Sequence, residues 1–241
     1  MSNSTDSSAS KSLRRAVSDP EEMVGHVIDE RYRLKRFISQ GGMGAVFEAE
    51  HVTIQKSIAV KILHPSLVQV PELVQRFERE AFAIGRIDHP NCIRVSDFGK
   101  LDDGALFLVM EFLDGVSLAD RIDDGGPLST EHALRILRHV VRGLAHVHRA
   151  GIVHRDVKPE NIVLVDKDDD EDFAKLLDFG IAKLVGEAQR PDDHQLTQAG
   201  IAFGTPNYMS PEQTLGDSVD GRSDLYQATV VLFEMLAGRP P

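Results

Sequence analysis

The chain has 241 residues, a formal net charge of −11, one cysteine and no tryptophan. Its 41% hydrophobic and 27% charged residues are typical of a soluble globular protein and exclude a fibrous or wholly disordered one. The lone Cys92 excludes an intrachain disulfide, and the acidic balance disfavours nucleic acid as a partner.

Residues 1–26 differ in kind from the rest of the chain. They are rich in serine and poor in large apolar residues, so burial could not offset the entropy of ordering them. We interpret them as a disordered tail without a secretory signal, because no apolar segment follows Met1. Apolar runs elsewhere, such as 105–110, fall far short of the ~20 residues of a membrane helix. We therefore expect no membrane segment and a cytoplasmic location.

The first half of the remaining chain is predicted to be mostly sheet. Short apolar or alternating runs, which are typical of strands, occur at 32–34, 45–47, 58–60, 93–98 and 106–112. Between them, residues 73–87 switch to helical spacing, with apolar side chains three or four residues apart.

The second half is predicted to be helical. Ser129 or Thr130 is a plausible N-cap for a helix that Gly151 ends. Its apolar face is predicted at Leu134, Leu137, Val141, Leu144 and His148. A second helix is predicted from about residue 222 to 237, ended by Gly238. A β-rich lobe followed by an α-rich lobe is an α+β arrangement.

Two elements of the first half carry a phosphate-binding signal. Residues 38–46, ISQGGMGAV, place glycines between two predicted strands, where the absence of Cβ atoms lets backbone N–H groups approach phosphate oxygens. A glycine-rich hairpin without a ligand is the competing interpretation. Lys61 lies inside an apolar strand, where a buried ammonium needs an anion. Glu80 on the following helix is a suitable partner, and an exposed lysine at a strand end is the alternative.

A short segment of the second half concentrates catalytic residue types. Residues 151–161, GIVHRDVKPEN, contain a candidate base, a cation and an amide, and LDFG follows at 177–180. One aspartate could accept a proton, while the asparagine and the other aspartate could hold Mg²⁺ through oxygen atoms. The lysine could balance the charge of a phosphoryl group during its transfer.

In this order and spacing, the motifs resemble the eukaryotic-like (Hanks-type) protein kinase family, most closely its bacterial serine/threonine branch. The resemblance runs from about residue 32 to residue 241. GTPNYMSPE at 204–212 looks like the family's substrate-docking segment, and SDLY at 223–226 looks like the start of its central helix.

The resemblance implies a bilobal kinase fold within residues 27–241. The N-lobe would span about 32–110, the hinge 111–115, and the C-lobe 116–241 without its last helices. The family continues beyond the position of Pro241 with several more helices. We therefore expect a fragment, a truncated gene model or a chain completed by a partner, with apolar surface left exposed on the last helix.

The resemblance also implies ATP and Mg²⁺ as cofactors, with roles for particular residues. Lys61, oriented by Glu80, would hold the α- and β-phosphates, and Asn161 and Asp178 would coordinate Mg²⁺. Asp156 would orient and deprotonate the substrate hydroxyl, and Lys158 would contact the γ-phosphate. The phosphate loop and adenine site would be formed by Ile38, Ser39, Gly41, Gly44, Val46, Ala59, Met110, Glu111, Leu113 and Val163.

Further family features concern substrates and regulation. Lys158, two positions after Asp156, together with Thr205, implies protein substrates phosphorylated on serine or threonine. Arg155 could receive a phosphate carried by the activation segment. Thr197 is the best acceptor there, and self-association could allow its autophosphorylation. An apolar column of His154, Phe179 and Ile84, anchored by Asp224, is also implied.

Three features depart from the family or from a simple interpretation. Ser39 replaces the first glycine of the phosphate loop, which predicts a weaker grip on nucleotide. Residues 227–229, QAT, differ from the small-residue pattern usual early in the central helix. The acidic run 166–172 lacks the glycine and glutamate of an EF-hand, so we interpret it as a solvated turn.

The leading hypothesis is a magnesium-dependent serine/threonine protein kinase. The alternative is a kinase-shaped, ATP-binding regulatory module with little catalysis, suggested by Ser39 and by the expected loss of helices. A phosphotransferase for small molecules is disfavoured by the segment 204–212, which suits an extended peptide.

Overall fold

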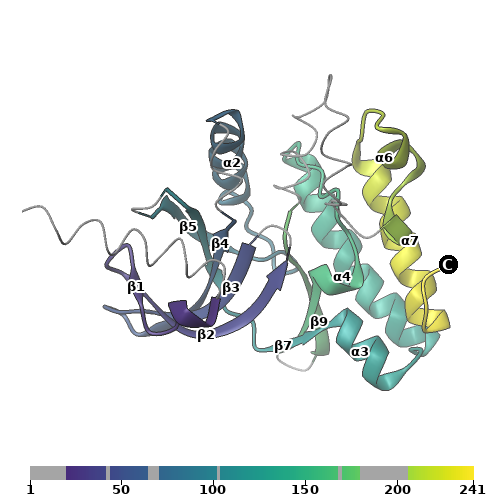
Figure 1. Ribbon diagram of the computed structural model, residues 1–241. Coiled ribbons are helices and arrows are strands. Elements are labelled where there is room, and N and C mark those ends of the chain that lie inside the picture. The colour runs from purple at the N-terminus through teal and green to yellow at the C-terminus, as the bar shows by residue number, and fades with distance from the viewer. Residues whose placement is uncertain (1–19, 42–43, 65–70, 102–103, 168–169, 180–205) are drawn as a thin grey trace, which may run out of the picture. The chain divides into compact units, whose positions relative to one another are not determined.

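The computed structural model describes residues 20–41, 44–64, 71–101, 104–167, 170–179 and 206–241, without the side chains of 71–73, 76 and 80. The chain divides into two units, drawn in Figure 1. The N-terminal unit runs up to residue 85 and includes 95–112, and the C-terminal unit contains 86–94 and 113–241.

The N-terminal unit is built on one antiparallel sheet in the order β1-β2-β3-β4-β6-β5. Its strands are β1 (Val27–Ile28), β2 (Tyr32–Gly41), β3 (Gly44–His51), β4 (Lys56–Leu63), β5 (Val95–Lys100) and β6 (Leu106–Glu111). One α-helix, α2 (Pro71–Ile84), contacts β5. The predicted strands and the predicted helix are therefore confirmed. Most boundaries shift by at most three residues, but β2 and β3 extend seven and four residues beyond their predicted ends.

One face of this sheet carries the core of the N-terminal unit. Phe47 of β3 and Val60 and Ile62 of β4 are at most 1% exposed and pack together with residues of β6. Because successive side chains of a strand point to opposite faces of the sheet, the residues between them project from the other face. Val46, Ala59 and Lys61 belong to that second face.

The folded part of the chain begins earlier than the sequence predicts. Pro20–Met23, inside the predicted tail 1–26, form the 3-10 helix η1, and Met23 is buried in the core of the N-terminal unit. Gly25 donates from its backbone N–H to the carbonyl of Leu34 in β2 (2.8 Å). Two buried residues, Pro20 and Met23, belong to this stretch, and a composition averaged over 26 residues does not reveal them. Residues 1–19 lie outside the described residues.

The C-terminal unit combines helices with a three-stranded antiparallel sheet in the order β7-β8-β9. Its elements are β7 (Gly115–Ser117), α3 (Leu118–Gly125), α4 (Thr130–Arg149), η3 (Pro159–Asn161), β8 (Ile162–Lys167), β9 (Asp170–Leu176), η4 (Pro206–Tyr208), α6 (Pro211–Leu215) and α7 (Gly221–Ala237). The helices α4 and α7 lie side by side in Figure 1, and α4 also contacts β9. The core of the unit lies among these three elements together with α3 and β8.

The predicted helix α4 is confirmed, but its predicted apolar face is wrong in part. Ser129 is the N-cap and accepts a hydrogen bond from the backbone N–H of His132. Leu134 is 51% exposed and Val141 36% exposed, whereas the core side of the helix is centred on other positions. At Gly143 a Cβ atom would lie 2.9 Å from the side chain of Leu176 in β9. The buried arc therefore includes a glycine, which contributes nothing to an apolar pattern.

The helix α7 is confirmed, and it ends at Gly238 in the left-handed conformation (φ 71°). Its core-facing residues include Val231 and Met235, which are at most 1% exposed. Leu225 is 47% exposed and Phe233 44% exposed. The helix therefore leaves apolar surface exposed, as expected.

The acidic run 166–172 is only partly the solvated turn that we predicted. Its second part belongs to β9, where Asp172 lies 2.8 Å from the Nε2 atom of His132 in α4. Asp170 lies 3.4 Å from the Nε2 atom of His139 in the same helix. The correction arises because a β-hairpin brings these carboxylates onto α4, which a pattern within the run itself does not show.

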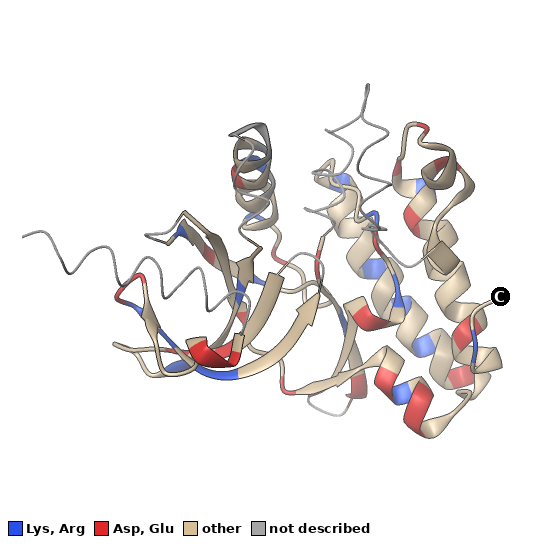
Figure 2. Cartoon of the chain, in the orientation of Figure 1, with Lys and Arg blue, Asp and Glu red and all other residues tan. Residues whose placement is uncertain are grey.

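Charge is distributed unevenly over the elements, as Figure 2 shows. Three of the four charged residues of α3 are acidic, and α4 carries a series of arginines. Within the described ranges, no helix combines the length and the apolar character needed to cross a membrane.

Candidate active site

The segment 151–161 brings three of the predicted catalytic residues together. It leaves α4 and ends in η3, which turns the chain back so that Asn161 donates from its backbone N–H to the carbonyl of Lys158 (3.0 Å). The Nδ2 atom of Asn161 donates to the Oδ2 atom of Asp156 (2.9 Å) and to its backbone carbonyl (2.8 Å). The Nζ atom of Lys158 lies 3.4 Å from Asp156 Oδ2. The Asp156 carboxylate is therefore oriented by an amide and a cation, and the residue is only 8% exposed.

The surroundings of Asn161 suit a hard divalent cation. With its Nδ2 atom bonded to Asp156, the remaining polar atom of its side chain is the Oδ1 oxygen. Leu177 donates from its backbone N–H to the carbonyl of Asn161 (2.8 Å), so Asp178 follows one residue after this contact. Amide and carboxylate oxygens are the ligands that Mg²⁺ prefers, often together with phosphate oxygens of the substrate. No group of three His, Cys, Asp or Glu side chains forms a metal site in the described part of the chain. A cation held by this pair would therefore need further ligands from a bound substrate or from water.

The buried Asp224 of α7 anchors the start of the catalytic segment. It is 0% exposed and accepts hydrogen bonds from the backbone N–H groups of His154 (2.8 Å) and Arg155 (2.7 Å). The Nε2 atom of His148 donates to the same carboxylate (2.6 Å). Arg155 has a φ of 65°, a conformation that a non-glycine residue keeps only when its surroundings hold it. These three hydrogen bonds compensate for the burial of the Asp224 side chain on α7.

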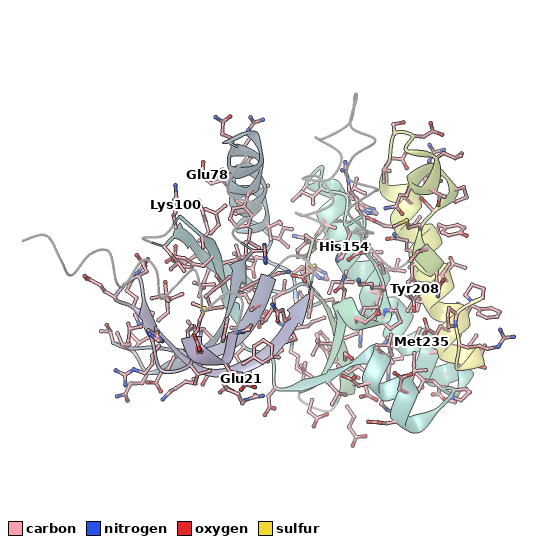
Figure 3. The ribbon with its side chains drawn as sticks, in the orientation of Figure 1. Glu21, Glu78, Lys100, His154, Tyr208 and Met235 are labelled. Atoms are coloured by element: carbon pink, nitrogen blue, oxygen red, sulfur yellow. The ribbon has the colours of Figure 1, made fainter. Side chains whose placement is uncertain are left out.

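His154 links the catalytic segment to the LDFG segment. The residue is fully buried (Figure 3), its Nε2 atom lies 2.8 Å from the carbonyl of Leu177, and its ring packs on that of Phe179 with centroids 5.1 Å apart. These contacts confirm the implied stacking of His154 and Phe179 and its anchor at Asp224. Burial lowers the pKa of His154 despite the nearby carboxylates. The ring is therefore neutral, with Nε2–H as the donor to Leu177.

We expect acidification to destabilise the C-terminal unit. Burial lowers the pKa of His154, His139 and His89 below their usual value. The unfolded chain therefore takes up protons near pH 6.5 that the folded chain does not bind. Above about pH 7.5 both the folded and the unfolded chain hold these histidines neutral, so they should leave the free energy of unfolding unchanged. Below that pH it should fall, by up to about 1.4 kcal/mol per pH unit for each such histidine, towards their folded-state pKa values.

Urea unfolding between pH 7.5 and pH 5.5 measures this effect, with the variant His139→Gln for comparison. The variant should show a shallower decline, because it removes one of the three groups. Equal unfolding free energies at both pH values in the unsubstituted chain would contradict the prediction.

The predicted nucleotide-binding residues of the N-terminal unit share one face of its sheet. Val46 of β3 is in register with Ser39 of β2 and with Lys61 of β4. Ala59 of β4 is in register with Met110 of β6. Neighbours in register on adjacent strands point to the same face, and so do residues two apart in one strand. The structure thus brings Val46, Ala59, Lys61 and Met110 together on the face opposite the core.

Gly44 of the predicted phosphate loop has a structural reason in the sheet itself. Gly41 pairs with Gly44, which has a φ of 145°. A Cβ atom on Gly44 would lie 2.0 Å from the carbonyl oxygen of Ile62, so only glycine fits there. The interpretation as a plain glycine-rich hairpin therefore also accounts for Gly44. Ile38, nearby in β2, is 41% exposed.

Of the remaining predicted site residues, some have a described position and others do not. Glu111 ends β6, and Leu113 and Val163 belong to the C-terminal unit, where Val163 of β8 pairs with Ser117 of β7. The side chain of Glu80, and therefore its pairing with Lys61, lies outside the described residues. Thr197 and Thr205 also lie outside the described residues.

The described part of the segment that resembles a docking site, residues 206–212, forms hydrogen bonds with α7. The hydroxyl of Tyr208, which Figure 3 labels beside α7, donates to Glu234 (2.5 Å), and burial raises the pKa of this tyrosine. Glu212 accepts a hydrogen bond from Ser223 Oγ, which lowers the pKa of the carboxyl. Ser210 caps α6 and forms a capping box with Gln213. The sequence patterns predicted no role for Gln213 or for Gln227.

Known proteins are similar to this chain over most of its length. The family model "Protein kinase domain" matches residues 32–241. The serine/threonine-protein kinase pkn3 of Myxococcus xanthus is 43% identical over 223 residues, which are 92% of this chain and 40% of that protein. PrkC, a serine/threonine-protein kinase of Bacillus subtilis, is 37% identical over 219 residues, 91% of this chain and 32% of that protein. The chain thus spans well under half the length of these curated relatives.

A solved structure agrees with the fold as well. The crystal structure of the PknI kinase domain of Mycobacterium tuberculosis matches with a TM-score of 0.72 and 30% sequence identity, covering 90% of this chain and 78% of that one. The expected α+β kinase fold is confirmed by this likeness, with a unit that is mostly sheet and a unit that is mostly helical. On the extent of the family match and the shared fold, this chain belongs to the protein kinase domain family.

Proposed function

We propose that the chain is an ATP-dependent serine/threonine protein kinase, which transfers the γ-phosphoryl group of ATP to serine or threonine hydroxyls of proteins. The observation that carries this proposal is the arrangement around Asp156, whose carboxylate is contacted by Asn161 and Lys158. Membership of the protein kinase domain family supports it, and so do relatives named as serine/threonine-protein kinases.

Asp156 is the proposed base. Its carboxylate accepts the proton of the substrate hydroxyl, so that the oxygen can attack the γ-phosphorus while the bond to the β-phosphate oxygen breaks. The hydrogen bond from Asn161 Nδ2 to Asp156 Oδ2 orients the carboxylate for this step. Lys158, beside the same carboxylate, can stabilise the negative charge that the transferring group carries.

Asn161 and Asp178 are the proposed ligands of Mg²⁺. The Oδ1 atom of Asn161 and the carboxylate of Asp178 supply oxygen donors, and phosphate oxygens of ATP complete the set. Bound Mg²⁺ would neutralise charge on the β- and γ-phosphates during transfer. The hydrogen bond from Leu177 N–H to Asn161 O keeps the two segments that carry these ligands adjacent.

The nucleotide itself is assigned to residues of both units. Lys61, oriented by Glu80, would hold the α- and β-phosphates, and Gly41 and Gly44 would let backbone N–H groups approach them. Ser39 in place of a glycine predicts weaker nucleotide binding. The adenine site would be formed by Ile38, Val46, Ala59, Met110, Glu111, Leu113 and Val163.

The decisive experiment is phosphoryl transfer by the purified chain. Incubation with γ-labelled ATP, Mg²⁺ and a generic basic protein should place label on serine or threonine of the acceptor, and the variant Asp156→Asn serves as the control. Nucleotide binding without any transfer would instead favour the alternative, a regulatory ATP-binding module.

We also propose Thr197 as a site of autophosphorylation between two copies of the chain. Phosphothreonine there could pair with the Arg155 guanidinium, since arginine binds phosphate bidentately. Mass spectrometry after incubation with Mg–ATP should find phosphate on Thr197, and Thr197→Ala should lower transfer to an added substrate. A fully active enzyme without modification at Thr197 would contradict this proposal.

A further inference from the structure

Two glutamines hold the peptide groups on both sides of Asp156. Gln227 of α7 is 1% exposed, and its Oε1 atom accepts a hydrogen bond from the backbone N–H of Val157 (2.8 Å). Its Nε2 atom donates to the backbone carbonyl of Arg155 (3.2 Å). Gln213 of α6 donates from its own Nε2 atom to the same carbonyl (2.8 Å). One side-chain amide thus spans the residue before and the residue after Asp156, and a second amide supports it.

The backbone at this point needs such support. Arg155 is in the left-handed region (φ 65°), which persists for a non-glycine residue only when its surroundings over-determine it. Asp224 binds the N–H group of Arg155, and the two glutamines bind its carbonyl. The backbone atoms flanking Asp156 are thus held by side chains of both α7 and α6.

The two glutamines also bond to each other and to the docking segment 206–212. The Nε2 atom of Gln227 donates to Gln213 Oε1 (2.8 Å). The same Oε1 atom accepts a hydrogen bond from the backbone N–H of Ser210 (3.1 Å). A continuous chain of hydrogen bonds therefore runs from Ser210 through Gln213 and Gln227 to the peptide groups beside Asp156.

We propose that Gln213 and Gln227 are positioning residues, which couple the placement of the docking segment to the orientation of the Asp156 carboxylate. The inference rests on the proposed function, in which Asp156 is the base. The sequence shows Gln227 only as a departure from the small residues usual at this place. The structure supplies its reason, because a small side chain on α7 would not carry both an acceptor for Val157 and a donor for Arg155.

The expected kinetic effect concerns turnover and not nucleotide binding. Replacing Gln227 by methionine keeps the length of the side chain and removes its hydrogen bonds. A shift of the base by about 1 Å can lower the rate of a positioned reaction up to roughly 10²-fold. In the full chain, Gln227→Met should lower kcat by roughly 10- to 100-fold and leave KM for ATP unchanged. Gln213→Met should act in the same direction.

A double variant tests whether Gln213 and Gln227 act together or independently. Residues of one hydrogen-bond network have non-additive effects, so the double variant should lose little more than the stronger single variant. Thr229→Val is the matched control, because it also removes a side-chain hydrogen bond on α7, from Thr229 Oγ1 to the carbonyl of Leu225, at an exposed position. It should leave kcat unchanged.

Amide hydrogen exchange tests the inference without any need for activity. In Gln227→Met the amide of Val157 should exchange faster, while the amides of His154 and Arg155, bound to Asp224, should keep their protection. Unchanged exchange at Val157 would overturn the inference, and so would faster exchange throughout the C-terminal unit, which would indicate a general packing role. If the unsubstituted chain transfers no phosphate, the proposed function fails, and local exchange at Val157 still decides whether the glutamines hold the segment.

Discussion

Asp156→Asn is expected to lower phosphoryl transfer by roughly 10²- to 10⁴-fold, the usual range for loss of a general base. Asparagine has nearly the shape of aspartate, so its side-chain oxygen can still accept the hydrogen bond from Asn161 Nδ2. Its amide cannot take up the proton of the substrate hydroxyl. The loss should therefore appear in kcat, and the affinity for ATP should be retained or should rise slightly, because a negative charge near the phosphates is removed.

The measurement compares label transfer and nucleotide affinity for the two proteins under the same conditions. Asp166→Asn is a suitable control, because Asp166 is an exposed carboxylate near the end of β8 in the same unit. It should transfer label at the rate of the unsubstituted chain. Equal transfer by Asp156→Asn and the unsubstituted chain would refute Asp156 as the base.

Asp224→Ala is expected to destabilise the chain by about 3–5 kcal/mol, the usual result of removing one partner from a buried ionic network. The carboxylate is fully buried and accepts three hydrogen bonds, from the N–H groups of His154 and Arg155 and from His148. Without it, these donors are left in the interior with no acceptor. The left-handed conformation of Arg155 also loses its anchor, so any remaining folded protein should transfer phosphate slowly.

Urea unfolding measures the loss of stability, and Asp220→Ala gives a matched control on the same helix. Asp220 is an exposed N-cap of α7 and accepts a hydrogen bond from the backbone N–H of Arg222. Loss of an exposed N-cap costs about 1 kcal/mol. Similar destabilisation by the two variants would show that Asp224 acts only as an ordinary helix residue.

Much of the candidate site could be predicted because its residues lie close together in the sequence. Asp156, Lys158 and Asn161 fall within six positions, and the contacts among them form inside one loop and one turn of η3. The strand residues Val46, Ala59 and Lys61 were likewise predictable, since alternation along a strand decides which face each side chain shares.

Other predictions were wrong because distant elements decide them. Met23 is buried because the sheet of the N-terminal unit covers it, although its neighbours in sequence are polar. Leu134 is exposed because the elements packed on α4 cover a different arc of the helix. Asp170 and Asp172 face histidines of α4, which lie some thirty to forty residues earlier in the chain.

The sequence by itself determined the family, the succession of a half that is mostly sheet and a half that is mostly helical, and the chemical groups available for catalysis, because each of these depends on residue types and short spacings. Only the tertiary structure decided how the strained backbone beside Asp156 is held. Gln213, Asp224 and Gln227 reach it from positions 58 to 72 residues away, and hydrogen bonds between groups so distant along the chain form only after the helices α6 and α7 have packed.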